Sequence, residues 1–71
     1  MKYKYFVNYD GLKDCFFIKK VDKNNYKYNS RYKKYILNDY YIYDEKNMVF
    51  NTEKEALQDL KYTSKEIIKL Y

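Results

Sequence analysis

Carboxylates are the side chains in this sequence with the clearest capacity for chemistry. Asp39, Asp44 and Glu45 lie close together along the chain, and Asp10 lies four residues before Asp14. Paired carboxylates can transfer protons or bind Mg²⁺. These acids fall in or beside predicted hairpin turns, where Asp is favoured for its hydrogen bonds to the backbone. We therefore interpret them as turn residues and expect no catalytic site.

The other residue types needed for catalysis or for cofactors are scarce. The chain of 71 residues has no His, one Cys (Cys15) and one Gly (Gly11). Without His, the commonest general base and metal ligand are missing, and neither a Ser-His nor a Cys-His pair can form. A single Cys cannot assemble a zinc site, and a single Gly cannot build a glycine-rich phosphate loop. The sequence predicts a protein that is not an enzyme and holds no metal or cofactor.

Lysine and tyrosine, by contrast, are concentrated in a way that indicates binding. Residues 26–35 contain four cations and no acid. Residues 1–38 carry ten basic and three acidic groups, a net charge of +7, whereas residues 39–71 carry five and seven, a net charge of −2. Aromatic rings among cations can stack bases at about 1–3 kcal/mol each, while Lys contacts phosphates. The candidate residues for binding a partner or a nucleic acid are Lys19, Lys27, Arg31, Tyr32, Lys33, Lys34, Tyr41 and Tyr43.

The abundance of Tyr and Lys also has three simpler causes, and all three stay open. Lys, Asn, Tyr and Ile have A/T-rich codons, so the base composition of a genome could supply their number, although not their placement. Tyr and Phe are also enriched at protein interfaces, including those of homodimers. Finally, Lys on a solvated sheet discourages edge-to-edge association.

These residues must be positioned by strands, because apolar and polar residues alternate up to about residue 51. The sequence YDGL at 9–12 predicts a two-residue hairpin turn, since Gly tolerates a positive φ. Tyr9 would then face Leu12. One face of this hairpin carries Tyr3, Tyr5, Val7, Tyr9, Leu12, Phe16 and Ile18. The opposite face carries Lys2, Lys4, Phe6, Cys15, Phe17 and Lys19.

A second set of strands is predicted over residues 26–50. A turn at 22–25 leads into a long strand at 26–37, with a bulge or break near 29–30 or 33–34, where the alternation slips. A two-residue turn at 38–39 would place Tyr35 opposite Ile42 and Lys33 opposite Asp44, as a cross-strand ion pair. A short strand at 48–50 follows. In this register Tyr32, Lys34, Ile36, Tyr41 and Tyr43 share one face of the sheet.

The C-terminal segment is predicted to be helical over residues 52–71. Thr52 and Glu55 form a capping box, as do Thr63 and Glu66. Two short helices with a break near Tyr62 account for this pattern, and one continuous helix is the alternative. The predicted fold is therefore α+β: an antiparallel β-meander of four to five strands, packed on one face by one or two C-terminal helices, in a single small domain at 1–71.

These features together predict a small, basic, non-enzymatic binding protein. Its expected partner is a host protein or a protein–nucleic acid complex, and its composition suggests an accessory protein of a phage or mobile element, such as an anti-CRISPR or other anti-defence inhibitor. The alternative is a module that binds RNA or DNA directly through a basic, Tyr-rich sheet face. No membrane span or apolar signal segment is visible, so we expect a cytoplasmic protein.

Overall fold

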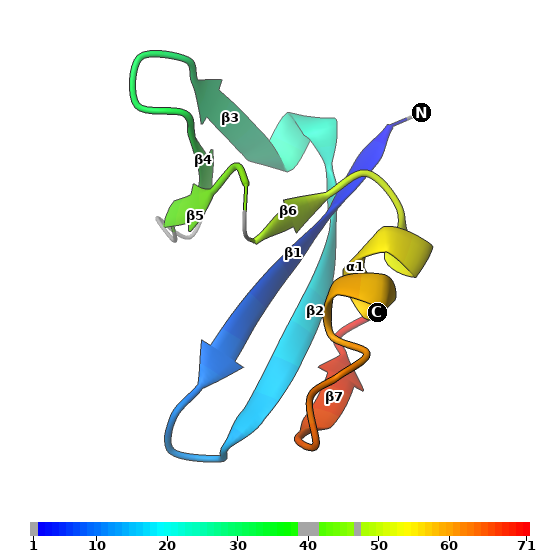
Figure 1. Cartoon of the computed structure of the whole chain (residues 1–71). Helices are drawn as coiled ribbons and strands as arrows, with labels where there is room; N and C mark the ends of the chain where they lie inside the picture. The colour runs from blue at the N-terminus through cyan, green and yellow to red at the C-terminus, as the bar shows by residue number, and fades with distance from the viewer. Residues whose placement is uncertain (1, 39–41, 47) are drawn as a thin grey trace.

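The computed structural model describes residues 2–38, 42–46 and 48–71, which form two β-sheets and one short helix (Figure 1). The elements in chain order are β1 (Tyr3–Asp10), β2 (Cys15–Asp22), a 3₁₀ turn η1 (Lys23–Asn25), β3 (Tyr26–Asn29), β4 (Lys34–Leu37), β5 (Ile42–Asp44), β6 (Val49–Phe50), α1 (Glu53–Asp59) and β7 (Glu66–Lys69). The first sheet has the strand order β6-β1-β2-β7, and the second has the order β3-β4-β5.

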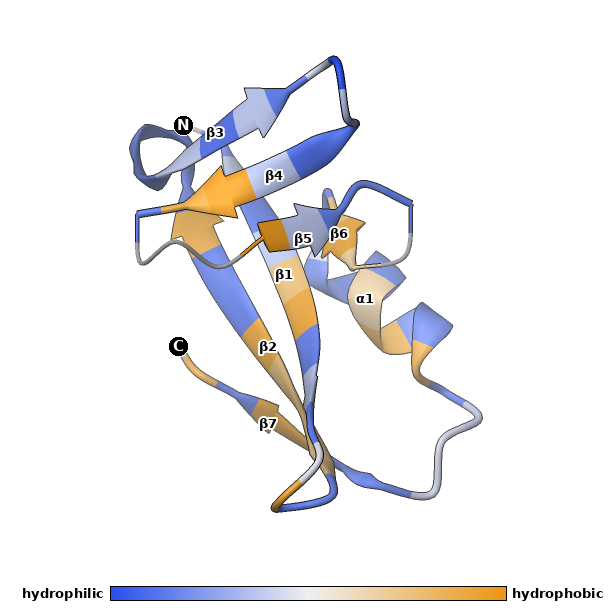
Figure 2. Ribbon diagram, turned by 90° about the vertical axis from the view of Figure 1, so that its left-hand side faces the viewer, coloured by the Kyte–Doolittle hydropathy of each residue, from blue (hydrophilic) through white to orange (hydrophobic). Residues whose placement is uncertain are grey.

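The long β1–β2 hairpin lies between the other two layers and is buried on both of its faces. Val7 and Ile18 on one face pack against Ala56 and Leu60 of the helical segment. Phe6, the neighbour of Val7, points to the other face and packs against the second sheet. Figure 1 shows the second sheet to the left of β1 and β2 and α1 to their right, and in Figure 2 the second sheet lies on the side of these strands that faces the viewer. The residues of the second sheet that contact Phe6 are Tyr26, Tyr35, Leu37 and Tyr43.

The predicted class, α+β with mainly antiparallel strands, is confirmed, but the predicted single meander is only partly matched. Residues 26–44 do not extend the first sheet. Strands β3, β4 and β5 form a separate sheet that covers the hairpin around Phe6, while α1 covers the other face. The side of the first hairpin that carries Phe6 therefore packs against the second sheet.

The first hairpin has a longer loop than predicted. Tyr9 pairs with Phe16 instead of Leu12, and Gly11 does not have a positive φ. The Asp10 carboxylate accepts hydrogen bonds from the backbone N–H groups of Leu12 (2.9 Å) and of Lys13 (3.1 Å), which stabilises a four-residue loop. Because the partner of Tyr9 moves by an even number of residues, each side chain keeps its predicted face.

The second set of strands differs more. The predicted strand at 26–37 is divided into β3 and β4, which reverse direction and pair as a hairpin, with Tyr28 opposite Tyr35. The break predicted near 29–30 or 33–34 is therefore a complete turn. On the next pair, Tyr35 lies opposite Tyr43 instead of Ile42. This shift by one residue turns Tyr43 into the core. The predicted turn at 38–39 includes Asp39, which lies outside the described residues.

The C-terminal segment contains one helix and one strand. The predicted first helix is confirmed: the Thr52 hydroxyl accepts a hydrogen bond from the Glu55 N–H (3.1 Å) and donates one to the Glu55 carboxylate (3.1 Å). The predicted second helix is wrong, because residues 66–69 form β7, parallel to β2. The Thr63 hydroxyl accepts from the Lys65 N–H (3.2 Å), a turn that leads into this strand. No helix in the described ranges is long and apolar enough to cross a membrane.

Burial on both faces of the β1–β2 hairpin can be tested with one substitution on each face. Phe6→Leu and Ile18→Val remove atoms from fully buried side chains, so each should lower the free energy of unfolding by about 0.5–3 kcal/mol. Leu12 is fully exposed in the hairpin loop, so Leu12→Ala should change it by less than about 0.5 kcal/mol. Urea unfolding followed by circular dichroism measures all three. A Phe6→Leu variant as stable as Leu12→Ala would show that the second sheet does not cover Phe6.

The conformation of Gly11 predicts the outcome of a second substitution. A two-residue Asp-Gly turn needs a positive φ at Gly, so Ala there would cost about 1–2 kcal/mol. In the four-residue loop φ is not positive, and a Cβ atom would lie 3.9 Å from the nearest atom, Cε2 of Tyr9. Gly11→Ala should therefore be neutral or stabilise by up to about 1 kcal/mol. A clear loss of stability in urea unfolding would favour the shorter turn.

Candidate partner-binding surface

The β3–β4 hairpin holds the largest group of predicted binding residues. Its turn is shaped by Asn29, whose side-chain oxygen accepts from the backbone N–H groups of Arg31 (3.1 Å) and Tyr32 (3.3 Å). Lys33 completes the turn in the left-handed region, with φ of 53°. The pairing of Asn29 with Lys34 then closes the ladder. The turn is thus held at both ends, although none of its residues is buried.

Four predicted binding residues lie on this hairpin, and we call them the hairpin tip: Arg31, Tyr32 and Lys33 in the turn, and Lys27 on β3, opposite Ile36. All four are exposed. Tyr32 has 63% of its surface accessible, and the guanidinium carbon of Arg31 lies 5.6 Å from the centre of its ring. Such a cation–π contact is worth about 0.5–1 kcal/mol at an exposed site. The turn therefore presents an exposed aromatic ring beside a guanidinium group.

Lys34 is placed differently, within the sheet. Its ammonium lies 3.0 Å from the Asp44 carboxylate, on the opposite strand. The predicted partner of Asp44 is Lys33, and the register shift of one residue accounts for the change. The backbone N–H of Lys46 (2.9 Å) and then the Lys34 ammonium hold the pKa of Asp44 below its ordinary value. Lys34 is half-buried, and its charge is partly compensated.

The remaining predicted residues do not join the hairpin tip. Tyr43 is 2% exposed and its ring lies 5.1 Å from that of Phe6, so its predicted place on a binding surface is wrong. The cause is the second sheet, which packs on that face. Lys19 lies on β2 opposite Phe6 and lines an open groove of about 520 Å³ with Leu37. Tyr41 lies outside the described residues.

Sequence reasoning missed the outward face of the second sheet. Ile36 and Ile42 are paired across β4 and β5 and point away from the core, and Ile42 is 63% exposed. Tyr28 is also exposed beside the hairpin tip, and its hydroxyl donates to the Glu45 carboxylate (3.1 Å). Burial and then this bond raise the pKa of Tyr28. The correct register of the second hairpin would have identified both features.

The candidate catalytic groups that the structure describes lie in structural contacts, and Asp39 lies outside the described residues. Asp14 accepts hydrogen bonds from the Lys65 ammonium and the Tyr9 hydroxyl, and these two contacts, in this order, hold its pKa below the ordinary value. Cys15 is buried, and burial is the main cause that raises the pKa of its thiol. Across the described part of the chain, no group of three or more Asp, Glu or Cys side chains could hold a metal ion.

Comparisons with known proteins give no further constraint on the site. A scan against protein-family models found no match, and neither a search of curated proteins nor a search of solved structures found one.

The Asp44 carboxylate, held by the Lys46 N–H and then by Lys34, predicts a pH dependence of stability. Because the pKa of Asp44 is lowered in the folded state, its contribution is present at neutral pH and is lost as the pH falls below about 4. Asp44→Asn should therefore lower the thermal midpoint at about pH 7 and have a smaller effect at about pH 2. Asp59→Asn, which removes an exposed carboxylate of α1, serves as the control. Equal effects of Asp44→Asn at both pH values would contradict this role of the Asp44 carboxylate.

Proposed function

We propose that this chain is a non-enzymatic binding protein that docks on a host protein or nucleoprotein complex through its hairpin tip. The observation that carries the proposal is Tyr32, a large ring that is 63% exposed and is held beside the Arg31 guanidinium. Tyr and Arg are among the residue types most enriched among the dominant residues of protein interfaces. Neither side chain contributes to the two cores.

The anchoring of the hairpin supports the same proposal. The inner side of β4 buries Tyr35 and Leu37 against Phe6, and Asn29 fixes the backbone of the turn. A partner therefore meets a surface whose backbone is already ordered. Binding to such a surface loses less conformational entropy than binding that must first order a loop.

Charge indicates the chemistry of the partner. Lys27, Arg31 and Lys33 are exposed, and residues 23–38 contain no acid. Two carboxylates near this hairpin already have partners. Asp44 forms an ion pair with Lys34, and Glu45 accepts a hydrogen bond from the Tyr28 hydroxyl. An acidic surface would be attracted and oriented by this arrangement.

Direct binding of RNA or DNA is the second candidate function. The same exposed ring could stack on a base, while Lys27 and Lys33 contact phosphates. The observation that favours this alternative is the exposed Tyr32 ring beside Arg31. An extended aromatic face does not support it, because Phe6 and Tyr43 are buried. The more specific expectation, that the partner belongs to a CRISPR or other defence system, stays a prediction.

The proposal is tested with a double variant and a matched control. Arg31→Ala with Tyr32→Ala removes the cation–π pair of the hairpin tip. Lys61→Ala with Tyr62→Ala removes a similar pair on the α1–β7 connection, where Tyr62 is 89% exposed and Lys61 lies 4.8 Å from its ring centre. Both variants should fold as the wild type does. Tagged protein purified from its host, with and without nuclease, should lose its partner only in the first variant.

The nuclease and salt dependence separate the two candidates. A protein partner should survive nuclease, whereas a nucleic acid should not. Direct phosphate binding also predicts a log–log salt slope of about 0.7–0.9 per contact. Retention of the partner by the Arg31/Tyr32 variant, or equal loss in both variants, would rule out docking through the hairpin tip.

A further inference from the structure

A cleft at the other end of β3 contains cations that the hairpin tip does not use. It lies between the start of β1, the start of β3 and the junction of β6 with α1, and has a volume of about 500 Å³. Its lining residues are Lys2, Tyr3, Lys4, Tyr26 and Asn51, none of which is an acid. This volume lies within the range of about 300–1,000 Å³ that is usual for small-ligand sites.

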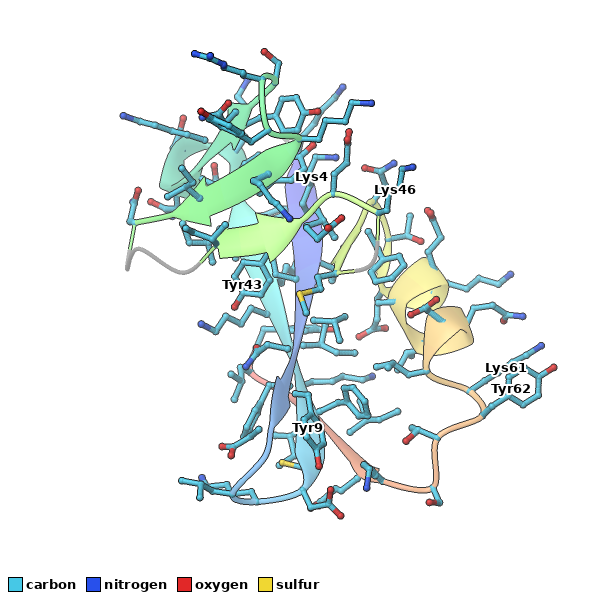
Figure 3. All side chains as sticks on the ribbon, turned by 60° about the vertical axis from the view of Figure 1, so that its left-hand side comes forward. Lys4, Tyr9, Tyr43, Lys46, Lys61 and Tyr62 are labelled. Atoms are coloured by element: carbon cyan, nitrogen blue, oxygen red, sulfur yellow. The ribbon has the colours of Figure 1, made fainter. Side chains whose placement is uncertain are left out.

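Lys4 is the central residue of the cleft. Tyr5 pairs with Phe50 across β1 and β6, so Lys4 and Asn51 are the next residues along, and the Lys4 ammonium donates to the Asn51 side-chain oxygen. The same ammonium lies 5.5 Å from the centre of the Tyr35 ring. Figure 3 shows Lys4 well separated from Lys61 and Tyr62. The backbone on both sides of this lysine is thus fixed by the first sheet.

Lys4 is half-buried, yet its contacts are with neutral groups. Lys34, Lys65 and Lys69 each lie within 3.1 Å of a carboxylate. No carboxylate of the described residues forms such an ion pair with the Lys4 ammonium. A partly desolvated ammonium is stabilised most by an anion, because a ring and an amide supply only part of the lost hydration.

Lys2 adds a second positive charge to the cleft, and Lys20 contacts one of its lining residues, Tyr3. Lys2 is exposed, and its carbonyl accepts from the Lys23 N–H (3.2 Å), which fixes its backbone against η1. The Lys20 ammonium lies 4.5 Å from the centre of the Tyr3 ring. Asp22, which pairs with Tyr3, accepts from the Asn24 N–H (2.9 Å) and caps η1.

We propose that this cleft binds a phosphate group, with Lys2, Lys4 and Asn51 as its hydrogen-bond donors. The ammonium groups of Lys2 and Lys4 come from the start of β1, and the Asn51 amide comes from the junction of β6 with α1. Together they can donate to several oxygens of one phosphate. Tyr3 and Tyr26 line the rest of the cleft and provide apolar surface for the group that carries the phosphate. The site shares no residue with the hairpin tip, so it is independent of the proposed docking.

The test is an NMR titration of the ¹⁵N-labelled full chain at constant ionic strength, with sodium chloride as the reference. Two probes are used separately: inorganic phosphate and a short oligothymidylate. Saturable shifts are expected at the Asn51 side-chain amide and the Lys4 backbone amide. Shifts with both probes identify a general phosphate site, and shifts with the oligonucleotide alone identify the nucleic-acid backbone as the source. No saturable shift with either probe overturns the proposal.

Matched variants assign the binding to the cleft. Lys4→Gln should weaken binding about tenfold or more, because it removes a charged donor. Lys2→Gln, at an exposed position that cannot disturb the core, should also weaken it. Lys61→Gln removes the same charge elsewhere and should change affinity by less than about twofold. Equal affinities of the Lys4, Lys2 and Lys61 variants would overturn the proposal. The Arg31/Tyr32 variant should keep phosphate binding, so this site and the docking surface can fail separately.

Discussion

Phe6 and Val7 are adjacent in β1, and each lies in a different core. Successive side chains of a strand point to opposite faces, so burying both residues requires a layer on each side of the β1–β2 hairpin. The chain supplies these layers in turn. The η1 turn leads β2 into the second sheet, and β6 then returns to β1, where the Val7 N–H donates to the Met48 carbonyl (2.8 Å). The helix and the second sheet therefore both depend on the same strand.

Tyrosine makes two small cores feasible in a short chain. Tyr26, Tyr35 and Tyr43 surround Phe6 with ring centres 5.1–5.9 Å away, a geometry worth about 0.5–1.5 kcal/mol per pair beyond the buried area. At the edges the hydroxyls reach carboxylates, as Tyr28 does with Glu45 and Tyr71 does with Glu53. A high Tyr content is thus largely structural. Tyr32 and Tyr62 stand out because their rings are mostly exposed and their identified ring partners are neighbouring cations.

The sequence predicts the face of a strand residue correctly only where the error in strand register is an even number of residues. The first hairpin has a loop two residues longer than predicted, and the predicted faces of Val7 and Phe6 are still correct, because an even shift preserves them. The second hairpin is shifted by one residue, which moves Tyr43 from the expected surface to the core. Local patterns could not show this, because the alternation in residues 26–37 changes phase at a full turn. Lys27, Arg31 and Lys33 belong to one hairpin, with Arg31 and Lys33 in its turn and Lys27 on β3.

The C-terminal strand shows a different limit. Ile67 and Ile68 follow a capping pattern and a helical spacing, yet they point to opposite sides of β7, and Ile67 joins the core around Ile18. The competing information is tertiary: β2 offers an open edge, and the Leu70 N–H donates to the Ile18 carbonyl (2.9 Å). β-branched residues are well suited to such an edge. Local helix signals are weak in comparison, since a short helix draws most of its stability from packing.

The pairing of β7 with β2 also brings lysines of the C-terminal segment to carboxylates of other elements. Lys65 pairs with Asp14 and Lys69 with Glu53, so the lysines of this segment meet carboxylates of the β1–β2 loop and of α1. The Tyr71 hydroxyl and then Lys69 hold the pKa of Glu53 below its ordinary value. Acids that could have neutralised the N-terminal half are thereby engaged in holding the last strand. The carboxylates of Asp14 and Glu53 thus help to hold the last strand, whereas the Lys4 ammonium contacts the neutral Asn51 amide and the Tyr35 ring.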